Sequence, residues 1–283
     1  MPELRLRGGE VDGLDLHYLV EGRGPAVVLV HGLGGFAESW RHTLRGLAAR
    51  TTVYALDLPG FGASAKPRTR YRLPYFAGAL HGFMEALGIQ GASLVGHSLG
   101  AAVAVTYAVT HPARVERLAL VGGVVPGFGY RPSWVYRLVA LPLIGEALAR
   151  CGSAALYKAA LARCFHRPVR EEVDFFVDFG FAARTAAEAR AAYLATLRHV
   201  RTDFEVHAED YRRAIATLDL PVLLIHGRQD RVVPSAHCAL VAEGFAHATV
   251  RWVDECGHFP QIEQAETVNR WLVDFLVGRP APR

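Results

Sequence analysis

The sequence predicts an α/β fold class: a mostly parallel, doubly wound sheet with an inserted helical cap. Unbroken apolar runs rich in β-branched residues, such as Ala26–Val30 and Thr52–Leu56, alternate with helical patterns. This alternation is typical of parallel strands that helices cover on both faces. It stops between about Pro126 and Asp219, where the pattern is helical throughout. With 283 residues, 51% of them hydrophobic, the chain is long enough for one such domain.

The expected elements begin with a half-solvated hairpin, because Leu4–Arg7 and Leu14–Tyr18 alternate apolar and polar side chains. The strands Ala26–Val30 and Thr52–Leu56 come next, and an apolar periodic stretch predicts a helix over Leu73–Leu87. The remaining predicted elements are the strands Ala92–Val95, Leu118–Val121, Pro221–Ile225 and Thr249–Val253, and a closing amphipathic helix over Val268–Leu276.

The helical stretch divides the chain into a predicted core of residues 1–125 and 220–283 and a predicted cap of residues 126–219. Its place between two sheet strands favours a lid over the carboxyl edge of the sheet. The alternative is ordinary helical packing on the core. The segment is rich in aromatic residues, namely Phe128, Tyr130, Trp134, Tyr136, Phe175, Phe176, Phe179 and Phe181.

Composition excludes several classes of partner. The net charge is +4 and the arginines are scattered along the chain, so no nucleic-acid partner is expected. No apolar run reaches the ~20 residues of a membrane span. Met1–Arg5 lacks the apolar centre of a signal peptide, which predicts a cytoplasmic location. The four cysteines lack metal-ligand spacing and are expected to be reduced and packed, the alternative being a reactive Cys256 close to His258.

The segment Gly96-His97-Ser98-Leu99-Gly100 stands between a predicted strand and a predicted helix. Glycines at these positions let the backbone turn sharply, which exposes the central serine hydroxyl at the sheet edge. With seven serines, and glycine at about one position in ten, ~0.07 chance matches to Gly-x-Ser-x-Gly are expected. Ser98 is therefore the candidate nucleophile.

A serine nucleophile needs a base, and the base needs an acid to orient it. His258 follows the last predicted strand and Asp230 follows the strand before it. The carboxyl ends of parallel strands meet along one edge, so these two residues can converge on Ser98. Asp254 is too close to His258 along the chain to be the better acid, and Val121-Gly122-Gly123 offers no carboxylate.

The reaction also needs donors for the oxyanion of its transition state. One is the backbone N–H of Leu99, the residue after the nucleophile. The second is expected from the loop His31-Gly32-Leu33-Gly34-Gly35, with Leu33 favoured over Gly34.

These motifs, together with Asp57-Leu58-Pro59-Gly60-Phe61-Gly62-Ala63-Ser64 and Gly257-His258, resemble the α/β-hydrolase superfamily. The resemblance implies a Ser-His-Asp hydrolase without metal or organic cofactor, in which Trp40 and the Asp57–Ser64 loop support the site. Related epoxide hydrolases and haloalkane dehalogenases carry aspartate where Ser98 stands. Relatives that cleave carbon–carbon bonds of ring-cleavage products often have asparagine beside the nucleophile, whereas His97 resembles esterases and lipases. Ala101 departs from the second glycine of many relatives.

The sequence thus predicts hydrolysis of a small-molecule carboxylic ester through an acyl-enzyme on Ser98. The cap aromatics favour a substrate with a hydrophobic acyl or aryl part, and we expect His97, Trp134 and Phe128 to line its pocket. The alternatives on the same triad are a thioesterase and a hydrolase of carbon–carbon bonds in ring-cleavage products.

Two further classes are less favoured by the sequence. A dinucleotide-binding enzyme would use Gly32-x-Gly34-x-x-Ala37 and Asp57, which leaves the Ser98 turn unexplained. A non-catalytic binding protein usually lacks a triad residue, and all three candidates are present here.

Overall fold

The computed structural model describes residues 3–278, without the side chains of residue 3 and residues 182–184. The first two and last five residues of the predicted core therefore lie outside the described part. The strands are β1 (Glu3–Arg5), β2 (Asp15–Glu21), β3 (Ala26–Val30), β4 (Thr52–Leu56), β5 (Ala92–His97), β6 (Val115–Val121), β7 (Val222–Gly227) and β8 (Ala248–Val253).

These strands form an eight-stranded sheet in the order β1-β2-β4-β3-β5-β6-β7-β8. β1 pairs antiparallel with β2, and β2 pairs antiparallel with β4. Every pairing from β4 across to β8 is parallel. The predicted hairpin and mostly parallel sheet are confirmed, and β3 and β4 have the predicted bounds.

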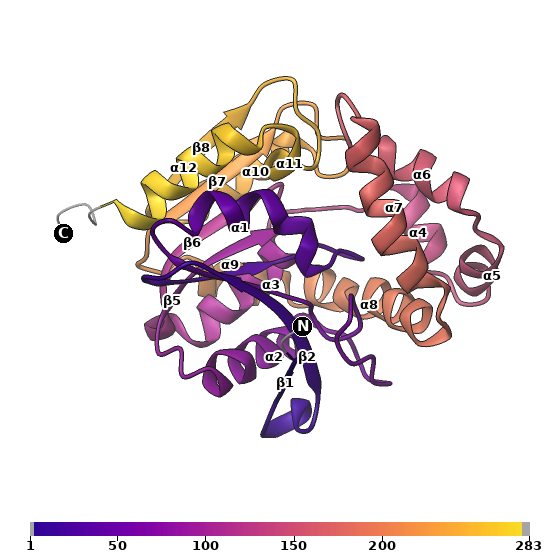
Figure 1. The fold of residues 1–283 in the computed structure, drawn as a ribbon, viewed down its shortest axis with the longest axis horizontal. Helices are drawn as coiled ribbons and strands as arrows, with labels where there is room; N and C mark the ends of the chain where they lie inside the picture. The colour runs from indigo at the N-terminus through magenta and orange to yellow at the C-terminus, as the bar shows by residue number, and fades with distance from the viewer. Residues whose placement is uncertain (1–2, 279–283) are drawn as a thin grey trace.

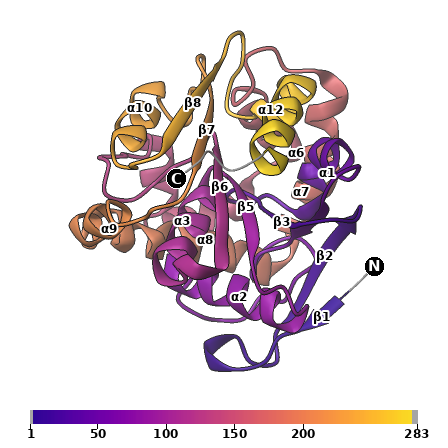
Figure 2. The ribbon, with the colours of Figure 1, turned by 90° about the vertical axis from the view of Figure 1, so that its left-hand side faces the viewer.

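Alternate strand residues face opposite sides of the sheet, and helices cover both sides (Figures 1 and 2). In β3, Val27 and Leu29 pack towards α1 and α12, whereas Val28 and Val30 pack towards α2 and α3. The core helices are α1 (Arg41–Leu47), α2 (Leu73–Ala86), α3 (Leu99–Thr110), α10 (Ser235–Glu243), α11 (Pro260–Glu263) and α12 (Ala265–Val277), with short 3-10 turns η1 (Gly9–Val11), η2 (Ala37–Trp40) and η3 (Pro112–Arg114).

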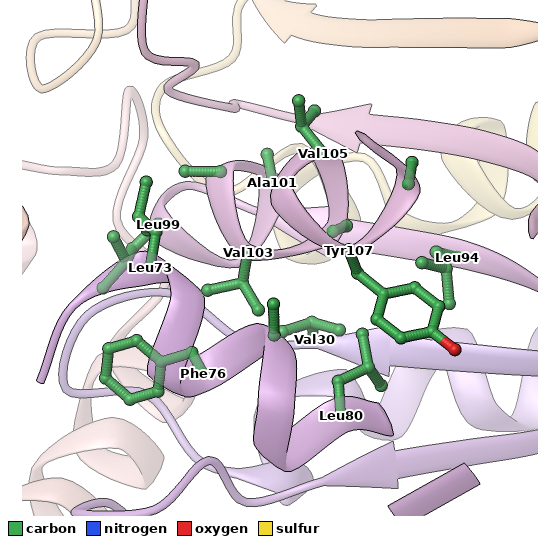
Figure 3. Packing of buried hydrophobic residues seen from close by; sticks show 14 of the residues in the cluster. Val30, Leu73, Phe76, Leu80, Leu94, Leu99, Ala101, Val103, Val105 and Tyr107 are labelled. Carbon is green, nitrogen blue, oxygen red and sulfur yellow. The ribbon is translucent and has the colours of Figure 1, made fainter. Parts of the chain in front are cut away.

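Helix α3 is the central packing element of the core. Ten of its residues, Leu99 to Ala108, are buried, so the helix is apolar on nearly all sides. Figure 3 shows Leu99 and Val103 beside Leu73 and Phe76 of α2. Because α3 begins directly after Ser98, this packing holds the serine at the sheet edge.

Six helices stand between β6 and β7, and the described part of residues 126–219 contains no strand. They are α4 (Trp134–Val139), α5 (Ile144–Cys151), α6 (Ala154–Ala162), α7 (Arg170–Thr185), α8 (Ala187–Glu205) and α9 (Ala208–Ile215). Figure 1 shows α4 to α8 at the end of the molecule away from α12. The limits of a cap at residues 126 and 219 stay a prediction.

The hairpin differs from the expected alternation at one position. His17 lies on the predicted half-solvated strand, yet it is buried, and its Nδ1 donates to Asp57 Oδ2 at 2.8 Å. That hydrogen bond raises the pKa of His17 against the opposing effect of burial. The tertiary partner therefore accounts for a polar side chain inside this strand.

Candidate active site

Ser98 occupies a sharp turn between β5 and α3. Its φ of 53° lies in the left-handed region, which is costly for a residue with a side chain. The neighbouring glycines are required by close contacts: a Cβ on Gly96 would lie 2.6 Å from Ala101 Cα, and one on Gly100 2.1 Å from Val30 O. A Cβ on Gly32 would come within 2.9 Å of Ser98 Cβ. The predicted turn sequence thus has a steric reason at each glycine.

The structure brings Ser98, His258 and Asp230 together. Ser98 Oγ donates to His258 Nε2 at 3.0 Å, and His258 Nδ1 donates to Asp230 Oδ2 at 2.8 Å. The side chains of His258 and Asp230 are 6% and 0% exposed. These three residues follow β5, β8 and β7, whose carboxyl ends share one sheet edge. The arrangement has the hydrogen bonds that activation of a serine nucleophile requires.

Asp230 is held by groups other than His258. Its Oδ1 accepts from the N–H of Val232 at 2.8 Å and of Val233 at 2.9 Å. Burial alone would raise the pKa of Asp230, but the charge and hydrogen bond of His258 outweigh burial and lower the pKa. An ionised Asp230 fixes the imidazole with its proton on Nδ1, so Nε2 is free to accept from Ser98.

Leu33 and Leu99 are the predicted oxyanion donors. Among the described residues neither backbone N–H donates to a protein acceptor. Leu99 is the first residue of α3, where N–H groups have no partner within the helix. The contact between Gly32 and Ser98 brings the Leu33 loop beside the nucleophile. Both amides are therefore available for an oxyanion.

His97 was expected in the substrate pocket, and in the structure its side chain is buried against His258 and Phe259. Its Nε2 donates to the carbonyl oxygen of His258 at 2.8 Å. Its ring lies 4.8 Å from the ring of His258 and stacks 5.0 Å from that of Phe259. Burial, aided by the charge of His258, lowers the pKa of His97 to about 3. His97 is thus neutral and supports the backbone of the candidate base.

A small cavity lies where the core meets α7 and α8. Its volume is about 20 Å³, which is room for about one water molecule. The lining residues are Gly34, Gly35, Phe36, Gly60, Phe61, Gly62, Lys66, Gly180, Ala189 and Tyr193. Since Gly34 directly follows Leu33, the cavity adjoins the loop of the candidate oxyanion donors.

Phe128 and Trp134, the other two expected pocket residues, lie outside this cavity. Phe128 is buried against Gly244, with the Arg212 guanidinium 5.9 Å from its ring centre. Trp134 begins α4 and is 73% exposed. A pocket role for either residue stays a prediction. The cap aromatics Phe175, Phe176 and Phe179 join α7 to the core by packing on Phe36, whose ring is stacked 5.4 Å from that of Phe179. Phe36 is the member of this cluster that the sequence analysis did not name.

Glu263 is a functional candidate that sequence reasoning missed. Its carboxylate accepts from the N–H of Gly257 at 2.9 Å and, from a loop after α6, from the N–H of His166 at 2.7 Å. Between the same two loops, the N–H of His258 donates to Cys164 O at 2.7 Å. This network ties the helical segment to the loop of the candidate base. Glutamate in a helical context carries no local signal for burial, so only the fold reveals this role.

Asp57 ties its loop to β2 and to η2 through hydrogen bonds. Asp57 Oδ1 accepts from Ala37 N at 2.6 Å, and Oδ2 accepts from Ala63 N at 2.7 Å and from His17. These contacts occupy the acid that a dinucleotide site would need for its ribose. Within the part of the chain that the structure describes, no three His, Cys, Asp or Glu side chains gather as metal ligands would, and no helix is long and apolar enough to cross a membrane. All four cysteines are free thiols, and burial raises the pKa of Cys256.

The chain is similar to known proteins over nearly its whole length. A family model described as alpha/beta hydrolase fold matches residues 25–265. The chain is 32% identical to the dihydrolipoyllysine-residue acetyltransferase component of the acetoin cleaving system of Cupriavidus necator, covering 95% of this chain and 68% of that protein. It is 30% identical to the 2-hydroxy-6-oxo-6-(2'-aminophenyl)hexa-2,4-dienoic acid hydrolase of Metapseudomonas resinovorans, covering 94% of this chain and 89% of that protein.

A solved structure of similar shape is the 2-hydroxy-6-oxo-6-phenylhexa-2,4-dienoate hydrolase of Rhodococcus sp. strain RHA1. It superimposes with a TM-score of 0.83 at 28% identity, over 98% of this chain and 99% of that one. The likeness therefore includes the helices between β6 and β7 as well as the sheet.

Proposed function

The chain belongs to the α/β-hydrolase fold family, a family of hydrolases, and from this premise we propose that it is a serine hydrolase of carbon–carbon bonds. Its proposed substrates are 2-hydroxy-6-oxo-hexa-2,4-dienoates, the linear products of aromatic ring cleavage. The observation that carries the proposal is the full-length likeness to two hydrolases named for such compounds, combined with a hydrogen-bonded Ser98, His258 and Asp230.

Carbon–carbon hydrolysis, an alternative in the sequence analysis, is thus favoured over ester hydrolysis. The sequence motifs fit both reactions, because both begin with attack on a carbonyl carbon. The names of the two relatives favour a dienoate as the substrate. The matches cover most of both chains, so the likeness is not limited to the sheet.

In the proposed reaction, Ser98 Oγ attacks the C6 carbonyl carbon while His258 Nε2 takes its proton. The resulting oxyanion accepts hydrogen bonds from the amides of Leu33 and Leu99. Cleavage needs the 2-oxo tautomer of the substrate, in which the enol proton has moved to C5. The C5–C6 bond then breaks, its electron pair passes through the C3–C4 double bond onto the 2-oxo oxygen, and that oxygen takes the proton from His258. Water, deprotonated by His258, cleaves the acyl ester of Ser98. One water is consumed, and a carboxylic acid and a 2-hydroxydienoate are released.

These substrates are carboxylates, and a cationic side chain beside the loop of the candidate oxyanion donors would favour their binding. Lys66 is the one positive side chain among the described residues that line the cavity. Its Nζ donates to Gly62 O at 2.7 Å and to Ser64 O at 2.8 Å, and burial lowers the pKa of Lys66. An ammonium has three N–H donors, which leaves one for a carboxylate of the substrate. We assign Lys66 this role within the proposal.

A second candidate is ester hydrolysis, which one observation favours. His97 stands beside the nucleophile, where ring-cleavage hydrolases often have asparagine, and esterases and lipases resemble this chain more closely at that position. Both reactions would use the same Ser98, His258 and Asp230, so mutation of these residues cannot separate them.

The deciding experiment compares kcat/KM for 2-hydroxy-6-oxo-6-phenylhexa-2,4-dienoate with kcat/KM for p-nitrophenyl esters from acetate to palmitate. We expect the dienoate to be favoured by about 100-fold or more, a difference of about 2.7 kcal/mol in transition-state binding. The Ser98→Ala variant serves as the blank for both substrates. An ester preferred by the same factor would establish the second candidate instead.

A further inference from the structure

The outer helices of the segment between β6 and β7 expose an unusual number of large apolar side chains. Thirteen such side chains are exposed in the described part of the chain, and eight of them fall within residues 134–156. An even spread over about 276 residues would put about one there. Soluble monomers rarely expose contiguous apolar patches of more than a few hundred Å², so a concentration of this kind marks an interaction surface.

The exposed residues share helix faces. Trp134, Val135 and Leu138 lie within one side of α4, and Ile144 and Leu148 are one turn apart on α5. The opposite side of α5 faces the protein: Gly145 is buried, and Glu146 forms an ion pair with Arg198 of α8. α5 is thus amphipathic, with its apolar side turned to solvent.

The turn between α4 and α5 completes this surface. Leu143 is 83% exposed and has a φ of 67°, a left-handed conformation that is costly for a bulky residue. Folding alone gains nothing from a strained leucine in water, which points to a role outside the folded chain. We define the outer cap face as Trp134, Val135, Leu138, Leu143, Ile144 and Leu148.

The charge of this surface selects its partner. Arg131, Arg137 and Arg150 are exposed beside the outer cap face. Between residues 131 and 150 the single carboxylate is Glu146, which pairs with Arg198. A two-fold dimer through this face would bring the arginines of one copy towards those of the other, and like charges repel. An anionic lipid surface instead supplies an apolar layer for the leucines and phosphates for the arginines.

We propose that the outer cap face binds peripherally to membranes containing anionic phospholipid, with Leu143 and Trp134 entering the headgroup boundary. Figure 1 shows α4, α5 and α6 at the end of the molecule away from α12, where no core element covers them. The neighbouring helices α7 and α8 supply Gly180 and Tyr193 to the cavity. The membrane contact would therefore hold the cavity close to the bilayer surface.

The test measures co-sedimentation of the full chain with phosphatidylcholine vesicles that do or do not contain about one third phosphatidylserine. We expect binding to the anionic vesicles, weakened at about 1 M salt because the charges are screened. The Arg137→Glu/Arg150→Glu variant should lose about 20-fold or more in partition, since each basic residue near such a surface contributes about fivefold. Arg45→Glu/Arg50→Glu, which reverses two exposed charges on the core, is its matched control.

The apolar contribution is tested with Leu143→Ser and Trp134→Ser against Val206→Ser, a valine 71% exposed outside the outer cap face. We expect the first two to weaken partition at least tenfold and the control to leave it unchanged, with all melting temperatures similar. Equal partition of the patch and control variants would overturn the proposal. A dimer in sedimentation equilibrium that Leu143→Ser abolishes would overturn it too, by identifying a second copy as the occupant. No catalytic activity enters these measurements, so their outcome is independent of the proposed reaction.

Discussion

The substitution Asp230→Asn tests the proposed triad at the residue that orients the base. An amide has one accepting oxygen and one donating nitrogen in place of two accepting oxygens. On the Oδ1 side two backbone donors, Val232 N and Val233 N, approach at 2.8 and 2.9 Å. Placing the amide nitrogen there would leave both N–H groups unsatisfied, at about 1–3 kcal/mol each. The oxygen therefore stays on that side, and the nitrogen faces His258.

This orientation forces the wrong tautomer on His258. The amide nitrogen introduced by Asp230→Asn would donate to Nδ1, so the imidazole proton moves to Nε2, which lies 3.0 Å from Ser98 Oγ. A protonated Nε2 cannot accept the hydroxyl proton. We expect kcat to fall about 10⁴-fold, the effect of the equivalent change in a serine protease, or about 5.5 kcal/mol.

The assay is steady-state hydrolysis of whichever substrate has the higher kcat/KM, the dienoate or a p-nitrophenyl ester. The rate of labelling by a fluorophosphonate is a second readout of serine activation. Asp254→Asn is the matched control, because Asp254 precedes His258 by four residues, is 79% exposed and pairs only with Arg228 among the ion pairs of the described chain. Its activity should stay within twofold of the wild type, on the order of 0.4 kcal/mol. A variant Asp230→Asn that keeps more than a tenth of wild-type turnover with an unchanged melting temperature would refute this account.

Three further predictions follow from the site. Lys66→Met should raise KM for the dienoate about tenfold, because about 1.4 kcal/mol of carboxylate binding is lost, and should leave KM for neutral esters unchanged. Equal changes in KM for both substrates would show that Lys66 does not bind the carboxylate. Glu263→Gln replaces one of the two accepting carboxylate oxygens with a donating nitrogen, so the N–H of His166 or of Gly257 loses its acceptor. This should cost about 1–3 kcal/mol of stability, measured by urea unfolding, and lower kcat; an unchanged kcat would separate Glu263 from the base. Burial lowers the pKa of His97 to about 3 and that of His237 to about 4, so each is neutral in the folded protein but gains a proton on unfolding below a pH of about 6.5. The free energy of unfolding should therefore fall by about 1 kcal/mol per histidine as the pH falls from about 7 to 5.5. His237→Gln should reduce this pH dependence, measured by urea unfolding at each pH.

The candidate site was predictable where its residues stand at strand ends. Ser98 could be identified from the glycines around it, whose positions tolerate no side chain: a Cβ on Gly100 would lie 2.1 Å from Val30 O. Asp230 and His258 follow from the topology, because parallel strands bring their carboxyl ends to one edge. The roles of His97 and Glu263 depend instead on partners more than 90 positions away, His258 O and His166 N. No local pattern encodes such contacts.

The sequence by itself determined the strands, the helical insertion and the three converging residues. Hydrophobic period and glycine placement are local properties of the chain, and the carboxyl ends of parallel strands share one edge whatever the order of the strands. The sequence did not determine which face of the inserted helices meets solvent. The apolar residues of α4 and α5 look like core residues in the sequence, and the structure exposes Trp134 and Leu143. Only the tertiary structure decides this, because the exposure of a helix face depends on which neighbours are present to cover it.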